Sequence, residues 1–299
     1  MRSGFVAIIG RPNVGKSTFL NTVIGKKIAI MSNKPQTTRN TISGVLTEED
    51  SQIIFIDTPG IHKPHNELGA RMTKSAYQST RGVDAILWMI SAKEHFTLGE
   101  EMILDNIKNT NTPVFLCINK IDLLKNRNEI DKIILEYKDK FNFKGIYPIS
   151  ALENQNIVHV LNDIKEVLPE GPQYYPADMI TDHPERFLIA EIIREKVLHN
   201  TEEEIPHSVA VVIDMLKKNE DNPNIIDCYA SIYVERKSQK GIIIGAGGSM
   251  LKKISSQARK DIINILGSKV YLEVWVKVKE DWRNRENALK SFGYGDDNF

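Results

Sequence analysis

Between residues 4 and 168 the chain alternates short, continuous apolar runs with stretches whose apolar residues recur every three or four positions. Continuous Val, Ile, Leu and Phe are typical of strands buried on both faces, and the longer spacing is typical of helices packed on a sheet. The alternation predicts an α/β unit with a mostly parallel sheet and helices on both faces. The strand-like runs are FVAII, QIIFI, VDAILWMI, PVFLCI and GIYPIS, and the helical stretches include KSTFLNTVIG, residues 66–81, GEEMILDNIKN, EIDKIILEYKDKF and NIVHVLNDIKEVL.

The pattern breaks at residues 169–186, PEGPQYYPADMITDHPER, where the prolines prevent either period from continuing. We interpret this segment as an ordered linker. A smaller α+β unit follows, with a helix (FLIAEIIREKVL), two strands (HSVAVVIDML and IDCYASIYVER), a glycine-rich turn, a helix (SMLKKISSQARKDIINIL) and a last strand (KVYLEVWVKV). The predicted domains are 1–170 and 185–299, joined by a linker over 171–184.

Composition narrows the class of protein. The 299 residues are 41% hydrophobic and 26% charged, a balance typical of a globular protein, and the formal net charge is zero. Zero net charge excludes a uniformly basic nucleic-acid binder but allows a local basic patch. No apolar run approaches the roughly 20 residues that cross a bilayer, and the N-terminus does not resemble a signal peptide. We therefore expect a cytoplasmic protein whose two cysteines, Cys117 and Cys228, are reduced packing residues.

The first motif is GRPNVGKS, residues 10–17, which follows a predicted strand and precedes a predicted helix. It matches G-x-x-x-x-G-K-S, the pattern of a phosphate-binding loop, although an ordinary strand-to-helix turn is the alternative. Its glycines allow successive backbone N–H groups to face an anion, the lysine can reach the outer phosphates, and the serine can ligate magnesium. The motif alone leaves ATP, GTP and other nucleotides open. The predicted contacts are Gly10, Arg11, Pro12, Asn13, Val14, Gly15, Lys16, Ser17 and Thr18.

Three more motifs follow strands. DTPG offers Asp57 to hold magnesium through water, and the Gly60 amide to bond a γ-phosphate. NKID offers Asp122, which can accept both hydrogens on the N1 and N2 edge of guanine, whereas adenine would leave that carboxylate unpaired. SAL can present a backbone N–H to the guanine O6, but each of these short motifs means little alone. The predicted contacts are Asp57, Thr58, Pro59, Gly60, Asn119, Lys120, Asp122, Ser150, Ala151 and Leu152.

The four motifs, in this order, resemble those of the translation-factor-like GTPases, and the preference for guanine rests partly on that resemblance. It implies a threonine in the loop NKPQTTRN as a magnesium ligand, for which we favour Thr38 over Thr37. Lys16, Thr38 and Gly60 are thus the expected catalytic residues, and Ser17, Thr38 and Asp57 the metal site. Ras-like enzymes carry a glutamine where this chain has Ile61, so we expect slow intrinsic hydrolysis. Relatives with an apolar residue there bind potassium through an asparagine that corresponds to Asn13.

The second predicted domain contains G-x-x-G at residues 245–248, directly before a helix. The motif alone is weak, but the order of elements around it resembles the type II KH domain, whose loop clamps about four unpaired nucleotides. Residues 236–279 carry ten basic and two acidic side chains, a net charge of +8, which favours RNA over a merely solvated helix face. The predicted RNA-binding residues are Gly245, Ala246, Gly247, Gly248, Lys252 and Lys253.

Together the two predicted domains resemble the bacterial Era-type GTPases, which share GRPNVGKST, QTTR, DTPG, NKID, SAL, ITDHPERF, EIIREK and LEVWVKVK. The resemblance implies a GTPase that binds single-stranded RNA near the 3′ end of the small-subunit ribosomal RNA and acts in assembly of that subunit. It also implies a monomer that associates peripherally with the inner membrane. A metabolic or tRNA-modifying GTPase and an RNA-binding protein with a degenerate nucleotide site are the alternatives. The tail aromatics Trp282, Phe292, Tyr294 and Phe299 could stack on bases or pack the C-terminus.

Overall fold

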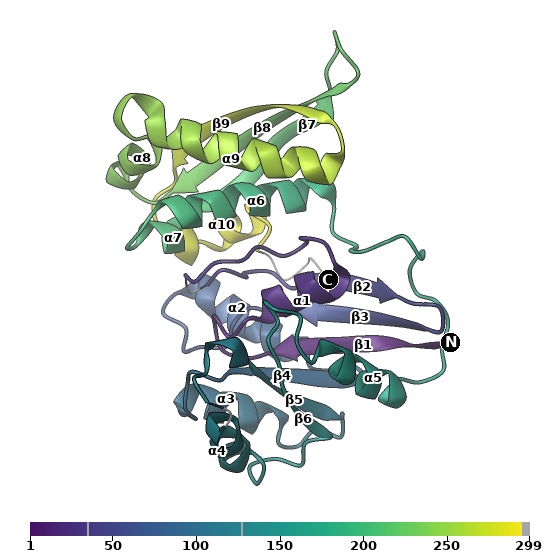
Figure 1. Cartoon of the computed structure of the whole chain (residues 1–299). Coiled ribbons are helices and arrows are strands. Elements are labelled where there is room, and N and C mark those ends of the chain that lie inside the picture. The colour runs from purple at the N-terminus through teal and green to yellow at the C-terminus, as the bar shows by residue number, and fades with distance from the viewer. Residues whose placement is uncertain (35, 127, 295–299) are drawn as a thin grey trace. The chain divides into compact units, whose positions relative to one another are not determined.

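The structure, a computed structural model, describes residues 1–34, 36–126 and 128–294. The chain divides into two compact units, which Figure 1 shows with their elements labelled. The first unit comprises Met1–Ala29, Thr38–His65 and Gly69–Asp182, and the second comprises Ile30–Thr37, Asn66–Leu68 and the residues from His183 onward.

The first unit is built on a six-stranded sheet with the order β2-β3-β1-β4-β5-β6. Neighbouring strands are parallel except β2 and β3, which form an antiparallel pair at one edge. This confirms the predicted α/β class with a mostly parallel sheet. Strand β2 was not among the predicted strands. The strands are β1 (Arg2–Ile9), β2 (Ile42–Thr47), β3 (Ser51–Asp57), β4 (Ala85–Ser91), β5 (Val114–Asn119) and β6 (Gly145–Pro148).

Helices cover this sheet, and one core joins it to α2, α3 and α4. Ala76, Ile103 and Ile133 from these helices pack with Trp88 and Ile9 from the strands. The remaining helices, α1 and α5, lie in front of the sheet in the view of Figure 1. The helices are α1 (Lys16–Ile24), α2 (Glu67–Gln78), α3 (Leu98–Ile107), α4 (Asn128–Tyr137) and α5 (Ile157–Val167).

The ends of the strands position the motifs. β1 ends directly before Gly10, β3 ends at Asp57, β5 ends at Asn119, and Ser150 follows β6 closely. Because these strands are parallel, their carboxyl ends meet at one edge of the sheet, which is where open α/β sheets bind ligands. The four motifs therefore converge although more than a hundred residues separate the first from the last.

The proline-rich segment after α5 runs along the first unit as ordered backbone. The Gln52 side chain accepts hydrogen bonds from the backbone N–H groups of Tyr174 and Tyr175 and donates to the Tyr175 carbonyl. The Tyr174 ring meets the Phe5 ring edge-on at 5.0 Å. The Val45 N–H also donates to the carbonyl of Ile180 at 2.9 Å. These hydrogen bonds satisfy backbone groups of a segment that forms neither a helix nor a strand.

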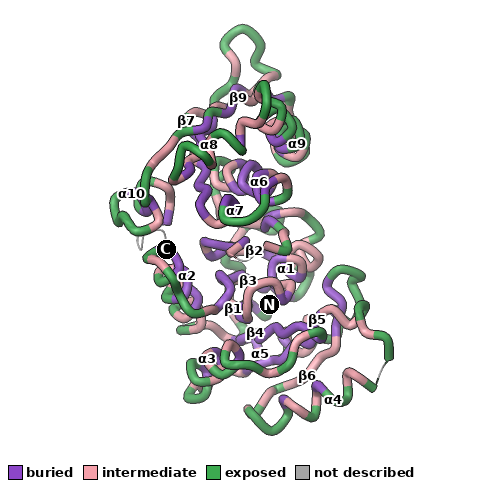
Figure 2. Tube along the Cα trace, turned by 90° about the vertical axis from the view of Figure 1, so that its left-hand side faces the viewer, coloured by how far each residue is buried: buried purple, intermediate pink, exposed green. Residues whose placement is uncertain are grey.

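The second unit has a three-stranded sheet, β7-β8-β9, in which β7 and β8 are antiparallel and β8 and β9 are parallel. Helices α6 and α9 pack on one face of the sheet, as Figure 2 shows from the side. The elements are α6 (Glu185–Asn200), α7 (Ile205–Ser208), β7 (Ala210–Lys218), β8 (Ile225–Val234), α8 (Lys237–Ile244), α9 (Ser249–Leu266), β9 (Lys269–Val278) and α10 (Glu286–Ser291).

Two details of this unit differ from the sequence analysis. The first strand begins at Ala210, because His207 and Ser208 belong to the short helix α7. The residues directly before G-x-x-G, for which no helix or strand was predicted, form the helix α8, and Gly245 follows its last residue with a positive φ of 72°. A run of three isoleucines favours strands when it stands alone, but here only Ile243 of that run is fully buried.

The two cysteines and two of the aromatic residues near the C-terminus are buried in the cores of the protein. Cys228 lies in the core of the second unit and Cys117 lies in the core of the first unit; both are buried free thiols whose pKa values are raised by burial. Trp282 is fully buried, donates from its indole N–H to the Ser208 carbonyl at 2.8 Å, and stacks on Tyr294. Trp282 and Tyr294 therefore pack the C-terminus, whereas Phe299 lies outside the described residues.

No helix in the described ranges is both long and apolar enough to cross a membrane.

Candidate nucleotide-binding site and KH loop

The loop after β1 follows a path that two of its glycines make possible. A Cβ on Gly10 would lie 2.3 Å from the carbonyl oxygen of Met89, and a Cβ on Gly15 would lie 2.2 Å from Asn119 Nδ2. Gly15 also has a φ of 103°, in the region that favours glycine. The loop can thus curl tightly against β4 and β5, and it leads into the N-terminus of α1, where half-buried Thr18 sits in the first turn.

Lys16 lies inside this curl. Its Nζ donates to the carbonyls of Gly10 at 3.2 Å and Arg11 at 2.9 Å. Burial lowers the pKa of Lys16 to about 8, and the nearby Asp57 carboxylate opposes that shift. A cation held at the centre of a loop of backbone N–H groups is suited to bind a phosphate chain.

The three predicted metal ligands meet beside Lys16. Ser17 Oγ donates to Asp57 Oδ2 at 2.7 Å and lies 2.9 Å from Thr38 Oγ1. Burial raises the pKa of Asp57 to about 6, while Lys16 and the hydrogen bond from Ser17 oppose that shift. The other carboxylate oxygen, Asp57 Oδ1, is buried and has no hydrogen-bond partner. Hydroxyl and carboxylate oxygens are the donors that Mg²⁺ prefers, and the unpaired Oδ1 is an oxygen that a cation would satisfy.

The two threonines of the loop before β2 have different partners. Thr38 Oγ1 faces Ser17, whereas Thr37 Oγ1 donates to the Lys34 carbonyl at 2.6 Å. The Thr37 hydroxyl is therefore occupied within its own loop. This geometry favours Thr38 as the magnesium ligand.

The NKID and SAL motifs are tied to the phosphate loop and to each other. Asn119 donates from Nδ2 to the Val14 carbonyl at 2.8 Å and accepts the Ala151 N–H at 2.9 Å. Lys120 Nζ donates to the Asn13 carbonyl at 2.5 Å. Asn119 and Lys120 thus hold the loops in place and act through other residues.

Asp122 is exposed to solvent, whereas Asp57, the other carboxylate of the motifs, is buried. The Asp122 carboxylate accepts a hydrogen bond from Ser150 Oγ at 2.5 Å, which fixes its orientation. Leu152, two residues after Ser150, is 72% exposed. An oriented, accessible carboxylate can accept hydrogen bonds from the edge of a base.

The side chains of several predicted contact residues bond other parts of the fold, so these residues can contact a nucleotide only through their backbone. Arg11 points into ion pairs with Glu94 at 2.7 Å and Glu100 at 3.4 Å. The Thr58 hydroxyl donates to the Ile8 carbonyl at 2.7 Å. Pro12 contacts the DTPG segment closely, since a Cβ on Gly60 would lie 2.6 Å from its nitrogen.

Ile61 is buried in the core shared with α2, α3 and α4. Its N–H donates to the Gly10 carbonyl at 3.1 Å, which joins DTPG to the phosphate loop. The position that carries a glutamine in Ras-like enzymes thus supplies no polar side chain to the site.

Sequence reasoning missed a residue that acts on these motifs from a distance. Thr22 on α1 donates to the Ala151 carbonyl at 2.8 Å and so holds the SAL turn. No local pattern marks a single threonine on a helix as a residue that holds a motif in place.

The G-x-x-G loop in the second unit has an open backbone. Gly245, Gly247 and Gly248 all have positive φ, of 72°, 57° and 80°. A Cβ on Gly247 or Gly248 would meet no atom within 4 Å. Lys252 and Lys253 are exposed in the following turn of α9. Backbone without covering side chains, next to a helix N-terminus and lysines, suits close approach of a phosphate backbone.

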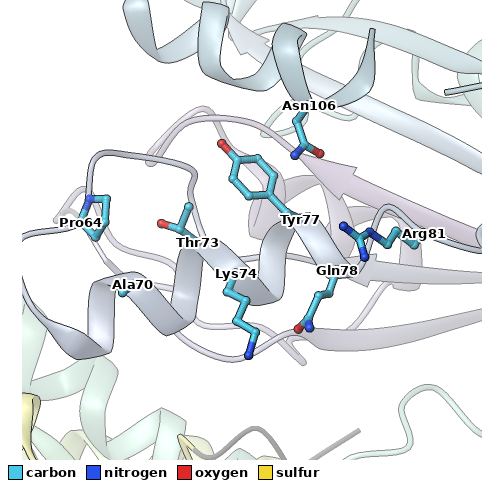
Figure 3. Close-up of a pocket in the computed structure, with 8 residues that line it drawn as sticks. All are labelled: Pro64, Ala70, Thr73, Lys74, Tyr77, Gln78, Arg81 and Asn106. Atoms are coloured by element: carbon cyan, nitrogen blue, oxygen red, sulfur yellow. The ribbon is translucent and has the colours of Figure 1, made fainter. Parts of the chain in front are cut away.

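A hollow of about 530 Å³ lies elsewhere on the first unit, along α2 (Figure 3). Thr73, Lys74, Tyr77 and Arg81 line it, together with Asn106 after the middle of α3. None of the four nucleotide motifs contributes to it, so it is separate from the site above. Among the described residues, His, Cys, Asp and Glu form no cluster of three or more that could hold a metal ion.

Two families match the chain. Residues 5–120 match the family described as 50S ribosome-binding GTPase, and residues 204–283 match the KH domain. A solved structure of Era in complex with MgGDPNP and nucleotides 1506–1542 of 16S ribosomal RNA shares 45% sequence identity, covers 99% of each chain and has a TM-score of 0.96. The chain belongs to the Era family of GTPases.

A second Era structure supports the same assignment. Aquifex aeolicus Era, as a variant bound to GDP·AlF4⁻, shares 44% identity over 99% of this chain and 100% of that one, with a TM-score of 0.93. The predicted family, fold class and enzyme class are thereby confirmed.

Proposed function

We propose that this Era-family protein binds and hydrolyses GTP with Mg²⁺, binds the 3′ end of the small-subunit ribosomal RNA through its KH domain, and acts in assembly of that subunit. The observation that carries the nucleotide part is the convergence of Ser17, Thr38 and Asp57 within hydrogen-bond distance, directly beside Lys16. The proposal includes a cytoplasmic monomer that contacts the inner membrane peripherally.

The phosphate loop and Lys16 bind the triphosphate. Backbone N–H groups of the loop, which Pro12 lacks, would bond the phosphates, and Lys16 would move its Nζ from the loop carbonyls to the outer phosphates. The hydroxyls of Ser17 and Thr38 would ligate Mg²⁺, and Asp57 would hold it through water. Bound Mg²⁺ would supply positive charge beside the phosphate oxygens.

Asp122 selects the base. Its carboxylate accepts from N1 and N2 of guanine, and Ser150 keeps it in the right orientation. Adenine has no hydrogen on N1 and no 2-amino group, so it would leave this carboxylate without a partner. The backbone of Ala151 adds an N–H near the guanine O6.

Hydrolysis depends on the backbone, Lys16 and bound cations, because Ile61 is buried and brings no polar group to the water. We therefore propose a slow intrinsic rate in which Gly60 positions the γ-phosphate through its amide. Asn13 would bind a potassium ion that adds positive charge beside the phosphates. Equal rates of GTP hydrolysis in sodium and potassium buffers, together with an unchanged rate for Asn13→Ala, would contradict the proposed role of potassium.

Two variants test the proposal on the two domains separately. Lys16→Ala should abolish GTP binding, because the outer phosphates lose their cation, and retained micromolar affinity would contradict the phosphate-loop assignment. Replacing Ala246 and Gly247 by aspartates should weaken binding of the 16S RNA segment 1506–1542 through bulk and repulsion, while GTP hydrolysis continues. Filter binding to that RNA and to tRNA distinguishes the assembly role from a tRNA-modifying one.

A further inference from the structure

The DTPG segment is followed by a polar side chain that the mechanism above does not use. Ile61 is buried, so the first polar side chain after Gly60 is that of His62. Its ring nitrogen Nδ1 lies 2.8 Å from the carbonyl oxygen of Gly60. A carbonyl oxygen can only accept a hydrogen bond, so Nδ1 carries a proton and donates it. His62 therefore bonds the backbone of the residue whose amide we assign to the γ-phosphate.

The peptide group between Gly60 and Ile61 is held at both of its polar atoms. Its carbonyl accepts the hydrogen bond from His62, and its N–H, which is that of Ile61, donates to the Gly10 carbonyl at 3.1 Å. The Gly10 carbonyl also accepts a hydrogen bond from Lys16 Nζ at 3.2 Å. One peptide group thus connects the His62 ring to the phosphate loop and to the cation inside that loop.

Packing alone does not fix the orientation of the Gly60 backbone. Gly60 lies against Pro12 so closely that a Cβ on Gly60 would be 2.6 Å from the Pro12 nitrogen, which limits movement toward the phosphate loop. Pro12 has no N–H, however, and cannot donate to the Gly60 carbonyl. Glycine rotates more freely than any other residue, so its orientation here depends on the hydrogen bonds that its neighbours make.

His62 is itself anchored to the helix that follows. Its carbonyl accepts a hydrogen bond from Thr73 Oγ1 at 3.2 Å, and Thr73 is a buried residue of α2. The His62 side chain is half-buried. Ordering a side chain on an anchored, partly covered backbone costs less conformational entropy than ordering it on a free loop. The ring is therefore in a position to hold the Gly60 carbonyl persistently.

We propose that His62 is a positioning residue for GTP hydrolysis, whose hydrogen bond from Nδ1 to the Gly60 carbonyl orients the Gly60 backbone so that its amide N–H meets the γ-phosphate. The inference rests on the proposed function, which assigns that amide to the γ-phosphate. A donor that is already oriented stabilises developing charge without reorganising during the reaction. GDP has no γ-phosphate, so the bond from His62 should matter for GTP and not for GDP.

Three substitutions of His62 separate the hydrogen bond from the bulk of the ring. His62→Phe keeps a ring of similar size without a donor, and His62→Ala removes both the ring and the donor. His62→Asn restores the donor, because the amide nitrogen of asparagine and Nδ1 of histidine are the same number of bonds from the backbone. His159→Phe is the matched control, since His159 is exposed on α5 of the same unit.

The experiment measures kcat for GTP and the Kd values of GDP and of the non-hydrolysable analogue GDPNP, with the full chain and Mg²⁺. His62→Phe and His62→Ala should lower kcat and the affinity for GDPNP by about 3-fold to 10-fold each, which is the effect of one hydrogen bond. Their affinity for GDP should not change. His62→Asn and His159→Phe should match the unchanged protein in all three quantities.

Several results would overturn the inference and leave the proposed function standing. One is an unchanged kcat and GDPNP affinity in His62→Ala. Another is an equal loss of GDP and GDPNP affinity, because His62 would then stabilise the whole site and not the contact to the γ-phosphate. A third is a loss in His62→Asn as large as that in His62→Ala, a comparison that holds even if His62→Phe does not fold. An unchanged protein that does not hydrolyse GTP would overturn both.

Discussion

Asp57→Asn should stabilise the nucleotide-free protein although it damages the site. The Asp57 carboxylate is fully buried, one of its oxygens has no hydrogen-bond partner, and burial raises its pKa from 3.8 to about 6. The folded state therefore binds a proton more tightly than the unfolded state does. The stability of the nucleotide-free protein should fall as pH rises from about 4 to about 6, and ionised Asp57 then costs about 3 kcal/mol at neutral pH.

An asparagine removes this charge and still accepts the hydrogen bond from Ser17. Lys16 loses a favourable neighbour in exchange, so the net gain in unfolding free energy should be smaller, about 1 to 2 kcal/mol. For a protein with domains of this size that corresponds to an increase of about 2 to 6 °C in Tm. Bound Mg²⁺ and GDP should reverse the order, because they stabilise the protein that has the carboxylate.

The assay is thermal unfolding of the full chain at pH 7 and at pH 4.5, with EDTA and with Mg²⁺·GDP. Asp139→Asn is the control, since that carboxylate is exposed in the turn after α4. A lower Tm of nucleotide-free Asp57→Asn at pH 7 would refute the reasoning. So would an equal gain with Mg²⁺·GDP, because the cost would then not come from a charge that the cation satisfies.

Three further predictions concern the surrounding residues. Gly15→Ala should abolish GTP binding in a nucleotide-binding assay, since its Cβ would lie 2.2 Å from Asn119 Nδ2 in a backbone with φ 103°; binding within a few-fold of normal would contradict this. Asp122→Asn should shift selectivity from GTP toward xanthosine triphosphate by about 100-fold or more, and an unchanged affinity ratio would refute the base assignment. Arg194→Ala should lower the free energy of unfolding by about 3 kcal/mol in urea titrations, because it leaves Glu191 buried without its 2.6 Å ion pair; a change below 1 kcal/mol would show that the pair contributes little.

The strands that carry the nucleotide motifs could be predicted because their burial on both faces leaves a continuous apolar signature, as in residues 53–56 and 114–118. β2 could not, because it is an edge strand whose apolar residues are interrupted by Ser43 and Gly44. α8 was missed for a different reason. Its three consecutive isoleucines are typical of a strand, whereas in the structure they form a helix that buries Ile243 in the core.

In the site, motif spacing was sufficient to find the residues, but it could not tell which side chains face the nucleotide. Arg11 and Thr58 lie within motifs, yet their side chains bond other parts of the fold. The stacking of Tyr229 on Trp275 also escaped prediction, because these two residues are distant in sequence and meet only through the parallel register of β8 and β9. Such contacts depend on tertiary pairing, which no local pattern encodes.

The most direct test of the account is GTP hydrolysis by the purified protein in potassium buffer, with and without the 16S RNA segment 1506–1542. We expect slow hydrolysis by the protein alone and clear stimulation by the RNA. The variant with aspartates at residues 246 and 247 should hydrolyse GTP at the basal rate and lose the stimulation. A rate of GTP hydrolysis that does not change at a saturating concentration of the RNA would contradict the claim that the two domains serve one function.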